Sequence, residues 1–324
     1  MRLPLLKLVP DNTNIDFLRW RGFAILVSVT LIAASVFFLA TRGLNLGVDF
    51  VGGQLVRATF SQPADLDDLR GRIGDLGLGE PSIQQFGSPR EVAIRLPLPA
   101  GGEEAANAAA SRVRAAILQR DPQARIDAVE TVSGKISGEL AQQGGLSLLL
   151  AMLGIALYIW FRFEWQFGVG ALISLVHDLT IVLGFYAATQ IDFGLDAIAA
   201  LLTLIGYSLN DTVVVYDRIR ENLKKYRKME IEPLLNLSVN ETLSRTVATN
   251  MSVLVAVGAL LAFGPDVIFS LTVGIFVGVI IGTYSSIYVA RFALVPLGVT
   301  SDSFVPKSAA PAGAERVHKE GYEA

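Results

Sequence analysis

With 324 residues, 52% of them hydrophobic, and a mean hydropathy of +0.49, the chain carries its apolar residues in long unbroken runs that indicate membrane spans. Its net charge of −3 says little about partners, and the arrangement of charge along the chain is more informative. The lack of cysteine excludes disulfides and thiolate metal sites. Two histidines are a poor basis for a histidine metal centre or a Ser-His-Asp triad, and the lack of a P-loop motif argues against ATP binding.

Six apolar runs are each long enough to cross a hydrocarbon core of about 30 Å as a helix. The first, Phe23–Ala40, follows a polar N-terminal stretch, and no small-residue cleavage site comes after it, so we interpret it as an uncleaved span rather than a signal peptide. The other five predicted spans are Gly144–Phe161, Phe167–Thr189, Leu195–Tyr216, Thr246–Phe263 and Val267–Ala290.

Lysine and arginine in the short loops predict the orientation of these spans. Basic residues gather before the first span, in the loop after the second, in the loop 217–245 and directly after the last span. The turns after the third and fifth spans carry Asp192 and Asp266 and no basic residue. Both termini are therefore expected in the cytoplasm. The basic loop either serves topology alone or also contacts anionic lipid or a cytoplasmic partner.

The segment between the first two spans has the pattern of a small folded domain on the far side of the membrane. Strands are predicted at Leu46–Phe60, Ser82–Phe86, Glu91–Leu96 and Ala124–Val132, and helices at Asp65–Leu76 and Glu103–Gln119. The order β-α-β-β-α-β is that of a ferredoxin-like α+β sandwich. The chain thus divides into a tail with the first span at 1–41, this domain at 42–140, a five-span bundle at 141–292, and a tail at 293–324 that is predicted to be disordered.

An ionisable residue inside a span costs free energy unless it is paired or faces a cavity, so such residues are the most informative ones. In the fourth span, Asp211 lies inside the cytoplasmic end and shares a helical face with the polar residues Tyr207 and Asn210. Two interpretations stay open. Asp211 is either an interfacial carboxylate with a structural role or a titratable carboxylate in a water-accessible seam between helices.

Arg245 opens the fifth span beside Thr246, at the end where the fourth span finishes, so its side chain could reach towards Asp211. Burial disfavours a charged carboxylate and a nearby arginine favours it, so the affinity for a proton would change if the pair opened and closed. One charge crossing the membrane field is worth about 2.3 kcal/mol per 100 mV, enough to bias a two-state element. The alternative is that Arg245 only anchors its span at the cytoplasmic surface.

His177 and Asp178 lie near the middle of the third span. Because adjacent side chains point about 100° apart on a helix, we expect the two not to face each other and each to find a partner on another span. They serve either an interhelical hydrogen bond or a proton relay.

Two glycine-rich motifs have structural interpretations. Gly274, Gly278 and Gly282 form a small-residue ridge along the sixth span, which would serve packing inside the bundle or docking of another subunit. Gly47–Gly53 holds three glycines beside an apolar stretch and predicts a tight entry into the sheet.

Several stretches together resemble the SecD/SecF family of bacterial protein-export subunits, which belongs to the RND superfamily. The longest match runs from Tyr207 to Asn222 and resembles the family's fourth-span signature. Shorter matches are the opening and closing motifs of the extracytoplasmic domain, the entry of the fifth span and the third-span pair, at Gly47–Gly53, Val132–Leu140, Thr242–Thr246 and His177–Asp178. Ser133 and Lys135 depart from the closing motif, where glycine and proline are more usual.

The resemblance implies a polytopic helical protein of the bacterial inner membrane, with six spans like half of an RND transporter and an extracytoplasmic ferredoxin-like domain between the first two. It implies a SecD partner, association with the SecYEG channel and often YajC, contact with membrane lipids and the translocating polypeptide, and use of the proton-motive force in late steps of export. Cofactors, nucleic acid and covalent catalysis are not expected.

The resemblance also implies roles for single residues. The family's fourth-span aspartate and fifth-span arginine, which match Asp211 and Arg245, serve the proton pathway, and a carboxylate of SecD would complete it. We therefore expect Asp211, Arg245 and Asn210 to form the relay. The secondary polar candidates inside the membrane are His177, Asp178, Tyr207 and Thr246.

Two other functions remain open. One is an RND-type proton-driven exporter of small molecules or lipids, although such proteins usually fuse two halves and carry much larger extracytoplasmic domains. The other is a structural translocase subunit that conducts no protons. The substitution Asp211→Asn separates this last function from a proton-driven one.

Overall fold

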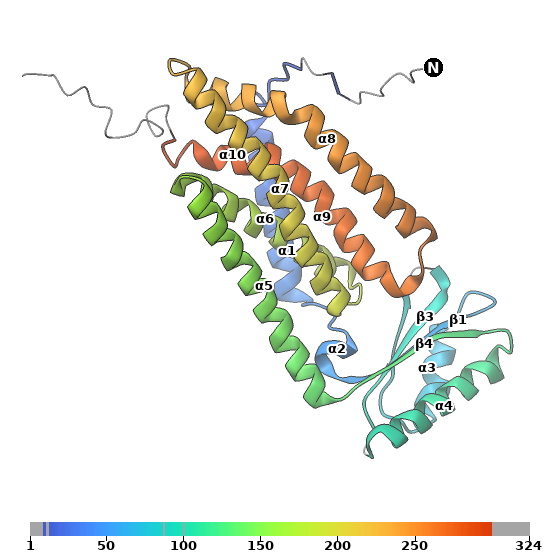
Figure 1. The fold of residues 1–324 in the computed structure, drawn as a ribbon. Coiled ribbons are helices and arrows are strands. Elements are labelled where there is room, and N and C mark those ends of the chain that lie inside the picture. The colour runs from blue at the N-terminus through green and yellow to red at the C-terminus, as the bar shows by residue number, and fades with distance from the viewer. Residues whose placement is uncertain (1–8, 11–12, 87, 100, 300–324) are drawn as a thin grey trace, which may run out of the picture.

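The computed structural model describes residues 9–10, 13–86, 88–99 and 101–299. In this part of the chain, six helical segments are long and apolar enough to cross a membrane. They are α1 (Arg21–Thr41), α5 (Gly134–Arg162), α6 (Trp165–Thr189), α7 (Leu195–Lys225), α8 (Ile231–Phe263), and α9 (Phe269–Ile287) continued by α10 (Val289–Leu294). Figure 1 shows them as one bundle with a small α+β domain at one end. Of the tail predicted at 293–324, residues 300–324 lie outside the described residues.

The small domain is a four-stranded antiparallel sheet with two helices on one face. Its elements are β1 (Gly53–Thr59), α3 (Leu66–Gly74), β2 (Ser82–Phe86), β3 (Ser88–Leu96), α4 (Gly102–Arg120) and β4 (Arg125–Val132). The strand order is β2-β3-β1-β4, and Val56 pairs with Ile94 on one side and Val129 on the other. Leu69 of α3 and Ile117 of α4 complete the core. This is the ferredoxin-like sandwich, so the predicted fold class is confirmed.

The entry into the sheet differs from the prediction. The expected strand Leu46–Phe60 begins only at Gly53, because residues Val48–Val51 form the short helix α2. Gly52 and Gly53 then take φ values of +73° and +123°, which favour glycine. A Cβ atom at Gly53 would also lie 2.7 Å from the Leu96 carbonyl oxygen. The glycines therefore turn the chain from a helix into the sheet, which an apolar pattern alone does not reveal.

The pattern of the basic segment 217–245 predicts a helix up to Met229 and a second short helix with Pro233 in its first turn, and the segment is indeed almost entirely helical. The difference from the prediction is that both helices are continuous with the neighbouring spans. The fourth-span helix continues to Lys225, and α8 runs unbroken from Ile231 through the membrane. Pro233 is tolerated in the first turn of α8, where its missing N–H would have no intrahelical partner. The extended ends pack on each other through buried apolar residues, among them Ile219, Leu223, Leu234 and Leu235. Similarly, α10 carries helix two residues into the expected tail at 293–324.

The glycine ridge of α9 packs inside the bundle. A Cβ atom would lie 2.9 Å from Ala200 if placed on Gly274, 2.9 Å from Leu204 on Gly278 and 3.2 Å from Ser208 on Gly282. These three partners lie four residues apart on α7, so the two helices approach closely along a full ridge. The seam between α7 and α9 is thus formed by glycine on one side and small or flexible side chains on the other.

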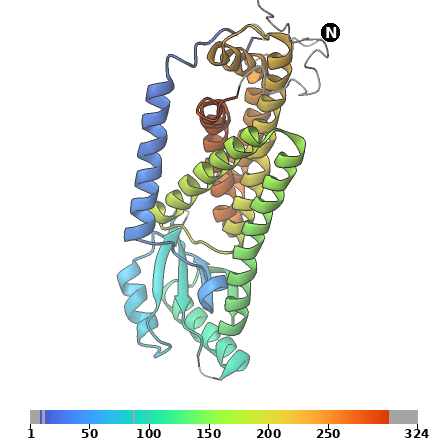
Figure 2. The ribbon, with the colours of Figure 1, turned by 90° about the vertical axis from the view of Figure 1, so that its left-hand side faces the viewer.

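The domain is fixed to the bundle by the loop between α6 and α7. The backbone N–H of Gly47 donates to the Phe193 carbonyl at 2.9 Å, and the Phe193 N–H donates to the Asn45 carbonyl at 2.9 Å. Arg95 of β3 forms an ion pair and hydrogen bond with Asp192. The turned view in Figure 2 again places the sheet at this end of the bundle. The loop that joins α6 to α7 is therefore also the attachment point of the domain.

We expect Gly278→Val to separate α7 from α9, because overpacking a well-filled interface costs about 1–3 kcal/mol. The melting temperature of the protein in detergent should fall by several degrees. Gly206→Val is the matched control, since no atom lies within 4 Å of a Cβ at that α7 position. Equal melting temperatures for the two variants would contradict the close α7–α9 contact.

Candidate functional site

Asp211 lies on α7 in the middle of the contact with α8 and α9. Its side chain is buried, with a relative exposure of 4%. The Asn250 side chain on α8 donates to the Asp211 carboxylate from Nδ2 at 2.8 Å. The same nitrogen lies 2.7 Å from the Thr283 hydroxyl on α9, which donates to the Val279 carbonyl at 2.6 Å. Asp211 is thus held by one amide that connects three helices.

Asn250 is only half satisfied. Its Oδ1 atom is buried and has no hydrogen-bond partner among the described residues. An unpaired buried acceptor costs free energy, and it gives the amide a reason to turn. In the orientation seen, the amide donates to a charged carboxylate. After a 180° turn of the amide, Oδ1 could accept a hydrogen bond from a protonated carboxyl group instead. The pair Asp211–Asn250 can therefore satisfy both protonation states.

The other residues predicted for the relay are separated from Asp211. No ion pair within 4.0 Å joins Arg245 to Asp211 in the described structure, and the Arg245 side chain is exposed on the outside of α8. Asn210 is exposed on the outer face of α7 and Tyr207 is half-buried. Thr246 is buried one turn before Asn250, on the same face of α8.

A second buried carboxylate, Asp178 on α6, has a relative exposure of 1%. It accepts hydrogen bonds from the hydroxyl groups of Ser208 on α7 at 2.6 Å and Ser285 on α9 at 2.7 Å. Its other oxygen lies 2.9 Å from Nδ1 of His177. Three groups from three helices thus surround one carboxylate, which is how a buried charge is stabilised.

The His177–Asp178 contact corrects the sequence-based expectation that the two side chains would not face each other. Their Cβ atoms diverge on the helix, but the imidazole ring and the carboxylate bend back and meet. The expectation of partners on other spans holds for both. His177 Nε2 lies 3.2 Å from the Ser28 hydroxyl of α1, and the ring stacks on Tyr284 at a centroid distance of 6.1 Å. The network therefore extends from α7 across α6 to α1.

The hydrogen-bond partners of the two carboxylates lie close together on α7 and α9. Ser208, which donates to Asp178, precedes Asp211 by three residues on α7, and Thr283 and Ser285 are close neighbours on α9. In the described part of the chain, no group of three or more His, Cys, Asp or Glu side chains could hold a metal ion. What the arrangement offers is a buried carboxylate, several hydroxyls and an imidazole, all groups that bind or pass protons.

Sequence reasoning missed several residues of these networks. They are Asn250, Thr283, Ser208, Ser285 and Ser28, which make the hydrogen bonds described above, and Tyr284, which stacks on His177 and lies 2.8 Å from the Ser28 hydroxyl. All six are polar residues of ordinary kinds inside apolar spans. The available signal was weak. Asn250 is an amide deep in a span, where an unpaired polar group is costly, and that alone marked it for a partner.

Ser208→Ala and Ser285→Ala should each destabilise the protein by about 1–3 kcal/mol, because each leaves the buried Asp178 carboxylate with one donor fewer. Ser252→Ala is the control, since that hydroxyl is exposed and donates to the Thr249 carbonyl of its own helix. Chemical unfolding in detergent measures the differences. In an Asp178→Leu background the serine substitutions should cost little, and an unchanged cost there would show that the serines do not act through Asp178.

Comparison with known proteins agrees with this arrangement. The family model for the C-terminal part of SecD/SecF protein export membrane proteins matches residues 112–299, and the SecD/SecF GG motif matches residues 37–64. Protein translocase subunit SecF of Pseudomonas aeruginosa is 44% identical over 302 residues, covering 91% of this chain and 95% of that protein. The SecF subunit of Cereibacter sphaeroides is 43% identical over 316 residues, covering 96% and 97%.

Solved structures show the same fold. A crystal structure of SecDF from Thermus thermophilus, described as a translocon-associated membrane protein, matches with a TM-score of 0.81 at 34% identity over 90% of this chain. A second structure, SecDF in a super-membrane-facing form, matches with a TM-score of 0.65 at 33% identity over 92% of it. This chain covers 39% and 40% of those longer chains.

The bundle of six spans, the inserted ferredoxin-like domain and the family matches over most of the sequence agree with one another. The chain therefore belongs to the SecD/SecF family of protein export membrane proteins, among the relatives that are SecF subunits of the protein translocase.

Proposed function

We propose that this multi-pass SecF-family protein couples the proton-motive force to late steps of protein export across the bacterial inner membrane, together with a SecD subunit. Asp211 is the residue that takes up and releases the proton. The observation that carries the proposal is the surroundings of Asp211. Among the described residues this buried carboxylate has one hydrogen-bond donor, Asn250, and no ion pair within 4.0 Å, and so it is less fully stabilised than Asp178.

Protonation of Asp211 would change two interactions at once. A neutral carboxyl group is no longer attracted to Arg245, and it can donate to Asn250 instead of only accepting from it. The amide joins α7, α8 and α9, so its reorientation acts on all three helices. The energy source is the proton gradient, and no cofactor is needed for this step.

Polar residues on the outer surface of the bundle support a second membrane subunit as partner. Thr203 and Asn210 of α7 and Arg245 and Thr249 of α8 are exposed, although lipid is a poor solvent for an amide or a guanidinium group. A SecD subunit covering α7 and α8 would bury these groups and bring its own polar residues to Arg245. The SecDF chains, more than twice as long as the part that matches here, have room for such a second half.

The two solved SecDF structures also support motion. They share nearly the same identity with this chain but match it with different TM-scores, 0.81 and 0.65, and one of them is described as a super-membrane-facing form. We take this difference as support for more than one arrangement of these elements. A subunit with two arrangements is what proton coupling requires.

Association with the SecYEG channel and YajC, contact with lipid, and cytoplasmic termini complete the proposal. The orientation rests on the basic residues of the N-terminal segment and of the α7–α8 turn.

The alternative is a structural subunit that conducts no protons. The three hydrogen-bonding partners of Asp178 favour a structural role for that residue. Asp211 has fewer such partners, so the same argument does not apply to it. An exporter of small molecules or lipids is less consistent with close relatives that are translocase subunits along almost their whole length.

Asp211→Asn should abolish the part of export that depends on the proton gradient and leave ATP-driven entry of the precursor unchanged, because an amide cannot cycle a proton. Export into inverted membrane vesicles, with and without an imposed gradient and at equal protein levels, measures both stages. Asp217→Asn is the matched control, since that α7 carboxylate is 61% exposed and pairs with Arg162 at the surface. Gradient stimulation of equal size in both variants would leave Asp211 with a structural role only.

A further inference from the structure

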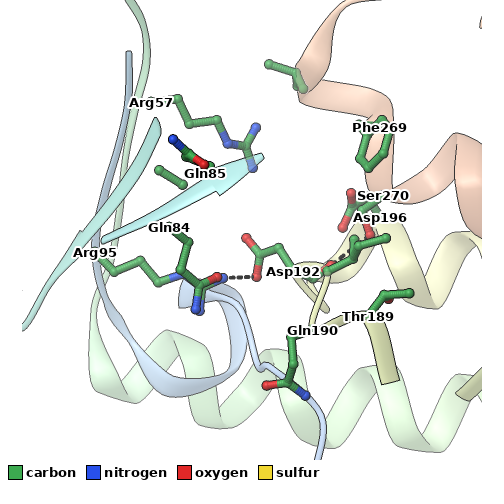
Figure 3. Close-up of a pocket in the computed structure, with 13 residues that line it drawn as sticks. Arg57, Gln84, Gln85, Arg95, Thr189, Gln190, Asp192, Asp196, Phe269 and Ser270 are labelled. Carbon is green, nitrogen blue, oxygen red and sulfur yellow. Dashed lines mark hydrogen bonds and ion pairs between the residues drawn. The ribbon is translucent and has the colours of Figure 1, made fainter. Parts of the chain in front are cut away.

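A crevice lies between the open face of the sheet and the end of the bundle (Figure 3). Its volume is about 270 Å³. One wall consists of the strands, with Arg57, Gln84 and Gln85, and the other consists of the bundle loops and the first turns of α7 and α9, with Asp196 and Phe269. The strand wall is the face that α3 and α4 do not cover, because Arg57 points away from its buried neighbours Val56 and Ala58.

Charged groups face each other across the crevice without meeting. Arg57 Nη1 is buried and makes no hydrogen bond to the described residues, and the Glu130 carboxylate beside it is 3.5 Å away. On the other wall, the hydrogen bond that the described residues give to the Asp196 carboxylate comes from the Ala197 N–H at 2.9 Å. No ion pair joins Arg57 to Asp196 in the described structure. The crevice thus presents an unused donor on one side and an under-used acceptor on the other.

Asp192 is different, because Arg95 already holds it. Burial raises the pKa of Asp192, and the Arg95 guanidinium opposes that rise. This pair also lines the crevice and does not engage Asp196 or Arg57, and the ion pair of Arg57 with Glu130 at 3.5 Å leaves the hydrogen-bonding capacity of Nη1 available to a ligand (Figure 3). A ligand that meets both needs a hydrogen-bond acceptor for Arg57 and a donor for Asp196, which the C=O and N–H groups of a peptide backbone provide.

The free edge of the sheet lies at the same place. β2 is an outer strand, and β3 is the one described strand that pairs with it. Gln84 and Gln85 point to opposite faces of the sheet, yet both line the crevice, so the crevice extends around this edge. An outer strand with unpaired N–H and C=O groups is a template for adding an extended peptide. Val267 and Phe269 on the opposite wall suit apolar side chains of such a peptide.

We propose that this crevice binds an extended segment of unfolded polypeptide, which adds to the free edge of β2 and places its backbone between Arg57 and Asp196. The proposal rests on the proposed role in export, because it names the place where this chain holds its polypeptide. The site adjoins the Arg95–Asp192 pair on the loop between α6 and α7. Occupation of the crevice therefore bears directly on the two helices that carry Asp178 and Asp211.

A zwitterionic lipid headgroup has the same pair of charges, and the crevice lies at the end of the spans where headgroups would be. A headgroup, however, makes no use of an unpaired strand edge. The polypeptide is therefore the occupant that accounts for both the charges and the edge, and lipid is the alternative that the experiment has to exclude.

The test places a photo-crosslinking amino acid at Gln84 of the full chain, assembled with its partner subunit in inverted vesicles that hold a stalled secretory precursor. Arg114 is the matched control position, exposed on α4 on the covered side of the sheet. We expect a crosslink to the precursor several-fold stronger from position 84 than from position 114, and a several-fold loss in Arg57→Gln and Asp196→Asn. Equal yields at both positions, or crosslinks from position 84 to lipid alone, would overturn the proposal.

A synthetic unfolded peptide tests the strand addition separately. Its crosslink at position 84 should disappear when alternate backbone nitrogens are methylated, and an unchanged yield would refute pairing with β2. Asp211→Asn should keep the crosslink while losing gradient-dependent export. If that variant exported normally and the crosslink persisted, the proton-coupling proposal would fail and the binding site would stand.

Discussion

A carboxylate inside a membrane has to be neutral, paired or surrounded by hydrogen-bond donors, and this one constraint determines most of the bundle. Asp178 is surrounded by two serine hydroxyls and an imidazole, and it connects α6, α7 and α9. Asp211 lies one turn beyond Ser208 on α7, and the one hydrogen bond that the described residues donate to it comes from the Asn250 amide. On the proposed function, this difference in donors separates a carboxylate that holds helices together from one that changes its protonation state.

The packing determines which elements would move if the protonation state of Asp211 changed. The glycine ridge of α9 lets α7 approach closely along its length, so the two helices are expected to move as a pair. α7 begins at the loop that carries Asp192 and Phe193, and this loop is bonded to the entry of the ferredoxin-like domain and to β3. A shift of α7 at Asp211 therefore has a direct route, through the chain and through hydrogen bonds, to the ferredoxin-like domain and to the crevice beside it.

Much of this architecture was predictable from the sequence. Long apolar runs specify the spans, and the alternation of the domain specifies its order of strands and helices, because both patterns follow directly from burial. The prediction failed where tertiary contacts decide. Residues 48–51 are helical because Gly52 and Gly53 turn the chain before the sheet. The helices expected in 217–245 are continuous with the spans, and Ile219, Leu223, Leu234 and Leu235 bury one another where the two extended ends meet.

The site was predictable in part. Asp211 stood out as a lone carboxylate in a span, and His177 and Asp178 as a polar pair. Helical periodicity grouped Asp211 with Asn210, but the bundle buries one and exposes the other, because only the fold determines which side of α7 meets α8 and α9. The fold also places the Asn250 amide, and not the Arg245 guanidinium, against the Asp211 carboxylate. A partner 39 residues away, on the next helix, leaves no local pattern in the sequence.

We propose that the protonation state of Asp211 determines how the domain sits on the bundle. The chain has no cysteine, so two can be introduced cleanly for spin labels, one at Arg114 on α4 and one at Met251 on α8, both exposed. Distances between the labels, measured in the assembled membrane complex, should shift to a new distribution in Asp211→Asn, which mimics the protonated state, and remain as in the unsubstituted protein in Asp217→Asn. Identical distributions in all three proteins would contradict the coupling of Asp211 to the domain.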